Sequence, residues 1–126
     1  MDRLFYICAS LAGFIAAAMG AFAAHAKASL PADLVGMFET AVRYQMYHAL
    51  ALFAAAWGWT HWRHRAIGAA GVLFIIGIVL FCGSIYLRVL TGAGWAAHLP
   101  PYGGMAFFTG WLCLAVGAWR APRHPH

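Results

Sequence analysis

Charged residues are scarce in this sequence. They make up 9% of its 126 residues, and three of them are acidic, whereas about 25% of the residues in a soluble globular protein are charged. Hydrophobic residues make up 64%, which is more than so small a domain can bury, because small domains keep a large share of their surface exposed. The composition therefore excludes an ordinary soluble domain and predicts a protein whose apolar surface is covered by lipid.

Motifs that mark known chemistry are also missing. The sequence has no nucleophile elbow, P-loop, dinucleotide-binding fingerprint or HExxH motif, so we expect no catalytic residues and no enzymatic activity. Cys8, Cys82 and Cys113 lie singly in apolar runs, which is typical of small packing residues, and we predict no metal and no cofactor. Nucleic acid is not an expected partner, because the basic residues lie at the ends of apolar runs instead of forming a patch.

Four apolar runs are each long enough to cross a bilayer as a helix, which takes about 20 residues. They span roughly 4–24, 34–59, 67–90 and 102–119. A signal peptide that ends near residues 21–23 is the alternative for the first run, but three more apolar runs follow it and favour a spanning helix. The sequence therefore predicts an all-α membrane protein with a single domain over 1–126, a four-transmembrane-helix antiparallel bundle that ends in a short basic tail at 120–126.

The distribution of basic residues predicts the orientation of this bundle. With four spans, the N-terminus, the second connection and the tail share one side, which holds Arg3, Arg63, Arg65, Arg120 and Arg123. The other side holds Lys27, with Arg88 near its edge. By the positive-inside rule both termini are cytoplasmic in a bacterial inner membrane, and in a mitochondrial protein the same side would face the matrix.

Small residues recur at a spacing of seven in two of the runs. They are Gly103, Gly110 and Gly117 in the last run, and Gly13 and Gly20, with Ala9 and Ala16 close by, in the first run. A stripe of small residues along one face of a membrane helix lets a neighbouring helix approach closely. We expect both stripes to be helix-packing faces.

The second run carries an unusual polar stretch over residues 38–48. Residues four apart stack on a helix, which places Glu39, Arg43 and Tyr47 on one face, with Tyr44 and His48 beside it and Gln45 on the opposite side. Topology brings polar groups of neighbouring runs to a similar level. The predicted intramembrane polar cluster is Glu39, Arg43, Tyr44, Tyr47, His48, His25, Ser84, Tyr86 and Arg88.

Three interpretations of this cluster stay open. A structural one pairs Glu39 with Arg43 and ties the second helix to its neighbours, because an unpaired charge inside a membrane costs about 2.5–3.5 kcal/mol or more. A second is a proton or ion pathway, with Glu39 as the titrating group and His48 as its relay near the midplane. A third is a haem or quinone site at which His25, His48 and His98 converge; without a CxxCH motif, covalent haem is excluded.

At these residues the sequence resembles a family of small membrane proteins, the domain-of-unknown-function family 423, which includes transmembrane protein 256 of animals. The matching segments are 20–25, 38–52, 81–87, 90–92 and 101–112, so they touch all four runs. Departures are small: Ala23 stands where the family tends to have Gly, Cys82 where Ser is usual, and residues 100–102 where a single Pro and an aliphatic residue are typical. The resemblance implies a four-helix multi-pass protein of the bacterial inner membrane and implies no activity.

These observations together favour a non-enzymatic, multi-pass inner-membrane protein that is a structural or accessory component of a larger membrane complex. Its expected partners are the lipid bilayer and either other membrane-protein subunits or further copies of itself. The alternatives are a small oligomeric transporter or proton/ion pathway that uses Glu39, Arg43 and His48, and a haem- or quinone-binding redox subunit.

Overall fold

The computed structural model describes residues 1–123, and these residues form helices and their connections, with no strand among them. The last three residues of the predicted tail at 120–126 lie outside this part of the chain. The elements in order are α1 (Asp2–Ala26), α2 (Ala32–Trp62), α3 (Arg65–Gly77), the π-helix η1 (Ile78–Gly83), α4 (Ser84–Thr91), the 3₁₀-helix η2 (Gly94–His98) and α5 (Pro100–Arg120).

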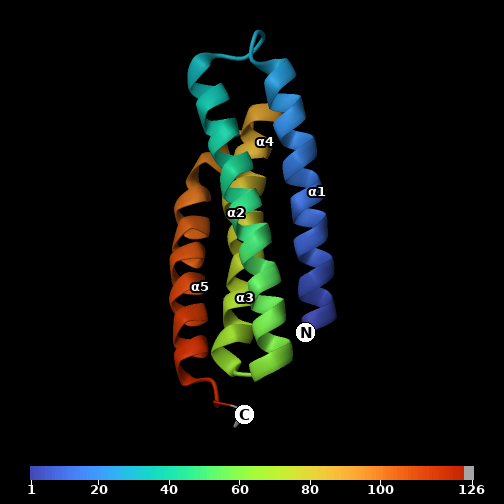
Figure 1. Cartoon of the computed structure of the whole chain (residues 1–126). Coiled ribbons are helices and arrows are strands. Elements are labelled where there is room, and N and C mark those ends of the chain that lie inside the picture. The colour runs from blue at the N-terminus through green and yellow to red at the C-terminus, as the bar shows by residue number, and fades with distance from the viewer. Residues whose placement is uncertain (124–126) are drawn as a thin grey trace.

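Successive long helices run in opposite directions (Figure 1). The chain goes up α1, down α2, up through α3, η1 and α4, and down α5, so that the N-terminus, the α2–α3 turn and the end of α5 lie at the same end. We call this the basic end. It carries Arg3, Arg63, Arg65, Arg120 and Arg123.

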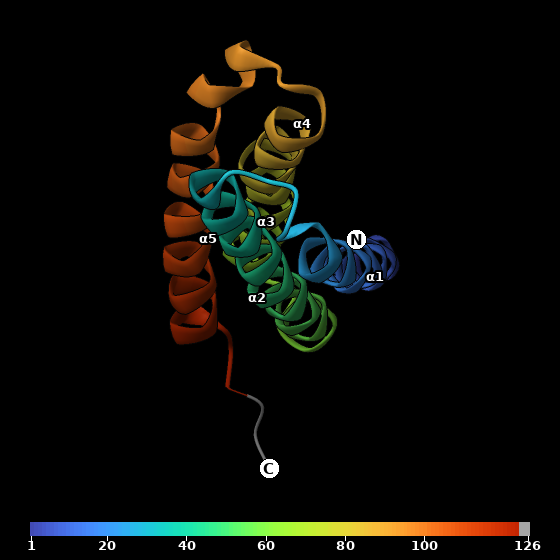
Figure 2. The same cartoon turned by 90° about the horizontal axis from the view of Figure 1, so that it is seen from above.

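The helices pack as two pairs joined through the middle. α1 packs chiefly on α2, α5 packs chiefly on α3, and α2 and α3 connect the pairs. Seen from above, α1 and α5 lie on opposite sides of α2 and α3 (Figure 2). The interior of the protein is therefore built on α2 and on the rod formed by α3, η1 and α4.

Three of the described helical segments are long and apolar enough to cross a membrane: Asp2–Ala26, Arg65–Thr91 and Gly94–Arg120. α2 is not among them, although its 31 residues exceed the length that a bilayer requires. The reason lies in its composition, since the polar stretch over residues 38–48 falls within α2.

Local sequence explains where the helices stop. Arg63 ends α2 in the left-handed conformation at φ 48°, and the His64 side chain then accepts a hydrogen bond from the backbone N–H of Ala66 over 3.1 Å, which caps α3. Gly92 ends α4 at φ 73°, a backbone conformation that glycine adopts without steric cost. α5 begins with Pro100 and Pro101, where the missing N–H groups would have no partner within the helix.

The predicted glycine stripe on α5 is confirmed as a close-packing face. A Cβ atom added to Gly103 would lie 2.4 Å from the backbone nitrogen of Phe81, and one added to Gly117 would lie 2.4 Å from the side chain of Ile67. Gly110 meets the ring of Phe74 in the same way, at 2.8 Å. The backbone of α5 therefore approaches the α3–η1 rod more closely than any side-chain-bearing residue would allow.

The stripe predicted on α1 is only partly right. Ala9, Ala12 and Ala16 are buried, but a Cβ atom on Gly13 would meet nothing within 4 Å. Since α1 packs chiefly on α2, its contact face follows the alanines, one residue away from Gly13.

The π-helical segment η1 contacts both α5 and α2. Phe81 meets α5 at Gly103, whereas the next residue, Cys82, donates its thiol hydrogen to the backbone carbonyl of Ala41 in α2 over 3.2 Å. Two adjacent residues thus contact two different helices. Single π-helical turns inside α-helices are frequent at functional sites, and this one adjoins the buried polar residues of α2.

Candidate functional site

Glu39 and Arg43, the charged residues predicted on the polar face of α2, lie near the surface and are not paired with each other. The Glu39 carboxylate forms an ion pair with Lys27 across the α1–α2 connection, with 3.0 Å between Nζ and Oε1. Arg43 is exposed and donates instead to the Thr40 hydroxyl over 3.3 Å. The predicted Glu39–Arg43 pair is therefore wrong for the residues that the structure describes, because Lys27 reaches the carboxylate from the neighbouring connection.

The face of α2 that turns inward differs from the polar face that the sequence suggested. Tyr44 and Tyr47 are 40% and 52% exposed, whereas Gln45 and His48 are only 2% and 5% exposed. Gln45 does lie opposite the Glu39–Arg43 face, as predicted, and that opposite side is the buried one. The interior therefore contains the neutral amide of Gln45 and the imidazole of His48, and the charged side chains of Glu39 and Arg43 lie outside it.

Gln45 joins three helices through two hydrogen bonds, and we call this arrangement the glutamine cluster. Its amide nitrogen donates to the backbone carbonyl of Ala12 in α1 over 2.8 Å. Its amide oxygen accepts the hydroxyl hydrogen of Tyr86 in α4 over 2.6 Å. In a lipid environment no water competes for these groups, so both ends of the amide hold neighbouring helices against α2.

His48 forms the histidine cluster with Tyr44 and Trp111, and its hydrogen bonds define its tautomer. The indole nitrogen of Trp111 in α5 can only donate, and it lies 3.0 Å from Nε2, so Nε2 is the acceptor. Nδ1 lies 2.6 Å from the backbone carbonyl of Tyr44, which can only accept, so Nδ1 carries the hydrogen. The geometry is that of a neutral imidazole with both nitrogens engaged.

Aromatic rings surround His48 on the side toward α5. Its imidazole stacks on Phe107 with 3.6 Å between ring centroids, and Tyr44 stacks on Phe81 at 5.1 Å. A cavity of about 230 Å³ adjoins this cluster. Its lining residues are Tyr44, His48, Gly104, Phe107, Phe108 and Trp111.

The other predicted cluster residues do not converge on His48. His25 and His98 are exposed near the opposite end from the basic end, and Arg88 is partly buried in α4. Ser84 is buried but donates to the carbonyl of Phe81 in its own rod. Within residues 1–123, no three His, Cys, Asp or Glu side chains are grouped so that they could hold a metal ion.

The structure adds Gln45, Cys82, Phe107 and Trp111 to the residues that the sequence singled out. A signal for Gln45 was present in the spacing of α2. Its buried residues include Phe38, Ala41, Gln45, His48 and Leu52, which alternate steps of three and four and so follow one helix face. No comparable local pattern marks Trp111 or Tyr86 as partners.

Comparison with known proteins places this arrangement in a family. Residues 19–104, which include both clusters except for Ala12 and Trp111, match the family described as "Protein of unknown function (DUF423)". The chain belongs to the DUF423 family. No solved structure matches it significantly.

Relatives of this DUF423 chain cover nearly its whole length. The UPF0382 inner membrane protein YgdD of Escherichia coli strain K12 is 34% identical, with 97% of this chain and 94% of the relative aligned. The UPF0382 membrane protein YwdK of Bacillus subtilis strain 168 is 35% identical, over 92% of this chain and 96% of the relative. With its membrane-length apolar helices, the DUF423 chain is a multi-pass membrane protein.

Proposed function

We propose that this protein is a non-enzymatic structural or accessory component of a larger complex in the bacterial inner membrane. One observation carries the proposal: the polar side chains buried in the interior are bound within the chain itself. Gln45 is held by Ala12 and Tyr86, and His48 by Tyr44 and Trp111. Within residues 1–123, no buried side-chain nitrogen or oxygen is left without a hydrogen-bond partner. These groups serve helix association and are not held ready for a reaction.

The proposed arrangement is a bundle of four membrane-spanning helices with both termini in the cytoplasm. The antiparallel course of the helices supports it, and so does the position of Arg3, Arg63, Arg65, Arg120 and Arg123 at one end. α2 counts as the fourth span in this arrangement. Its buried polar groups are hydrogen-bonded to other helices, which offsets the cost of placing them in hydrocarbon.

Partner subunits would contact the outer faces of α1 and α5, which lie on opposite sides of the protein. Both faces carry large apolar residues that the rest of the chain leaves uncovered. Phe14 on α1 is 71% exposed and Leu112 on α5 is 68% exposed. Either face is suited to a different membrane protein or to a second copy of this chain.

Purification of the tagged chain in a mild detergent tests the proposal. We expect one membrane protein to copurify at a fixed ratio, and we expect Phe14→Ala or Leu112→Ala to release it without lowering the melting temperature of the chain. Leu50→Ala serves as a matched control, since Leu50 is 59% exposed but lies on α2, outside both faces. A chain that purifies alone and as a monomer would refute the proposal.

A small transporter or ion pathway is the second candidate, favoured by the cavity of about 230 Å³ beside His48. Under this candidate, His48→Asn would abolish flux or phenotype while the protein stays as abundant as wild type. Under the accessory role it would instead lower abundance, because the bond to Trp111 is lost. A haem-binding role has less support, because ligation through Nε2 would require Trp111 to release that nitrogen.

A further inference from the structure

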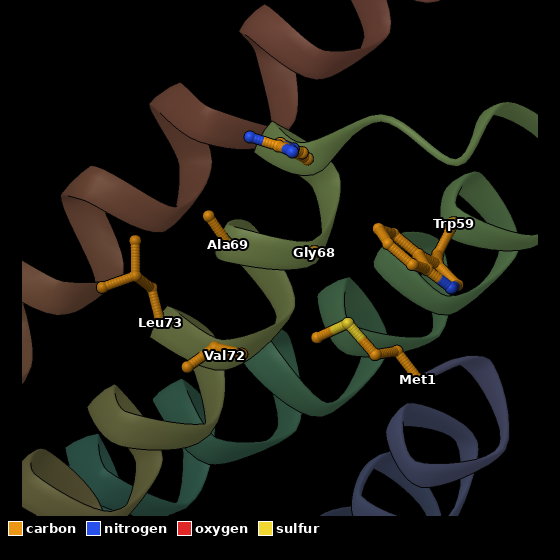
Figure 3. Close-up of a pocket in the computed structure, with 7 residues that line it drawn as sticks. Met1, Trp59, Gly68, Ala69, Val72 and Leu73 are labelled. Atoms are coloured by element: carbon orange, nitrogen blue, oxygen red, sulfur yellow. The ribbon is translucent and has the colours of Figure 1, made fainter.

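A hollow in the surface lies at the basic end, away from both polar clusters. It has a volume of about 490 Å³ and is an apolar groove on α3, closed on one side by the end of α2 and the start of α1. The groove is lined by Met1, Trp59, Arg65, Gly68, Ala69 and Val72, and it continues to Leu73. In Figure 3, Met1 and Trp59 lie across Gly68 from Val72 and Leu73.

Gly68 shapes the floor of this groove. A Cβ atom at this position would lie 3.0 Å from the ring of Trp59 and 3.6 Å from the sulfur of Met1, so the missing side chain lets both residues lie against α3. The lining residues from Arg65 to Leu73 extend along about 12 Å of helix, at about 1.5 Å per residue. The groove is thus long enough for the first part of an acyl chain.

Arg65 carries the charged side chain in the lining, and it lies at the first position of α3. Its side chain is exposed, and neither ion pair found within residues 1–123 includes it. The acidic side chain at the same end, Asp2, lies 3.9 Å from the amino terminus. Asp33 and Glu39 are near the other end of α2. Within residues 1–123, Arg65 at the mouth of the groove therefore forms no ion pair with a carboxylate.

We propose that the groove binds one anionic phospholipid of the phosphatidylglycerol type. An acyl chain would lie along Ala69, Val72 and Leu73, and the phosphate would meet the guanidinium of Arg65. A zwitterionic lipid brings its own cation and would leave the positive charge of the basic end uncompensated, whereas a net negative headgroup complements it. Trp59 suits this level, because tryptophan is enriched where hydrocarbon meets headgroups. The inference is independent of the accessory role.

The test is native mass spectrometry of the full chain in detergent, with phosphatidylglycerol or phosphatidylcholine of identical acyl chains added. We expect one phosphatidylglycerol per chain, bound at least about fivefold more tightly than phosphatidylcholine, as the gain from one arginine near a headgroup implies. Arg65→Gln should remove this preference. Arg120→Gln removes the same charge at the same end but outside the groove, and it should preserve the preference.

A second variant tests the groove itself. Ala69 is exposed, so Ala69→Phe fills the groove without changing the buried core, and it should abolish the bound lipid while the melting temperature of the lipid-free protein is retained. Equal binding of the two lipids would overturn the proposal. Equal losses in Arg65→Gln and Arg120→Gln would also overturn it, since they would show attraction to the charge of the whole end.

Discussion

Trp111 donates its indole hydrogen to Nε2 of His48 over 3.0 Å and so binds α5 to α2. The contact explains why a titratable side chain can lie deep in this protein. The donor fixes which nitrogen of the ring accepts, and the carbonyl of Tyr44 takes the hydrogen on the other nitrogen. His48 is thus held neutral and in a single tautomer by two neighbours, one from its own helix and one from another.

Nitrogen NMR of the chain with labelled histidine should show this tautomer directly. We expect Nδ1 of His48 to be protonated and Nε2 to be unprotonated at neutral pH. Trp111→Phe should lower the free energy of unfolding by about 1 kcal/mol, because it removes one interhelical hydrogen bond and leaves Nε2 unpaired. Trp119→Phe is the control, since Trp119 is 89% exposed on the same helix. A protonated Nε2 would contradict the assigned geometry.

Two adjacent glycines of α5 offer a test of the close approach between α5 and η1. Gly103→Ala places a methyl group 2.4 Å from the backbone of Phe81, and should cost about 1–3 kcal/mol of stability because the backbones must separate. Gly104→Ala meets nothing within 4 Å and should stabilise the helix slightly, by up to about 1 kcal/mol. Thermal unfolding in detergent measures both. Equal melting temperatures for the two variants would disprove the contact.

The ion pair between Lys27 and Glu39 should contribute little to stability, and Glu39 should be coupled to Lys27 and not to Arg43. Both side chains are substantially exposed, so we expect Glu39→Gln to lower stability by no more than about 1 kcal/mol. The charge reversal Lys27→Glu with Glu39→Lys should restore wild-type stability. Glu39→Gln and Arg43→Gln should have additive effects, because Arg43 donates to Thr40. Strong coupling between Glu39 and Arg43 would instead support the pairing within α2.

Much of the fold followed from the sequence, because the length and hydropathy of an apolar run depend on local composition. The run predicted at 67–90 corresponds to the rod from Arg65 to Thr91. The spacing of the glycines in α5 correctly predicted which face of that helix packs closely. The π-helical turn inside that rod had no signal in the sequence. Its residues Phe81 and Cys82 contact two helices that are distant in the sequence.

The candidate site was predicted less well, for two physical reasons. First, the polar face of α2 was predicted from its charged residues. Charged groups near a helix end remain exposed, and Glu39 forms its ion pair with Lys27 from the α1–α2 connection. The spacing that links Gln45 and His48 to Phe38 and Leu52 was the better guide. Second, Tyr86 is 41 residues from Gln45, and Trp111 is 63 residues from His48. Such contacts are set by how the helices assemble.

Buried polar groups of α2 hold the helices together through hydrogen bonds to other helices. A double-mutant cycle between Gln45 and Tyr86 measures this most directly, by reversible unfolding of the full chain in mixed detergent. Gln45→Leu and Tyr86→Phe should each cost about 1–2 kcal/mol, since each leaves a buried partner unpaired. The double variant should lose less than the sum of the two, with a coupling energy of about 0.5–1.7 kcal/mol. Additive losses, or a Gln45→Leu protein as stable as wild type, would contradict the claim.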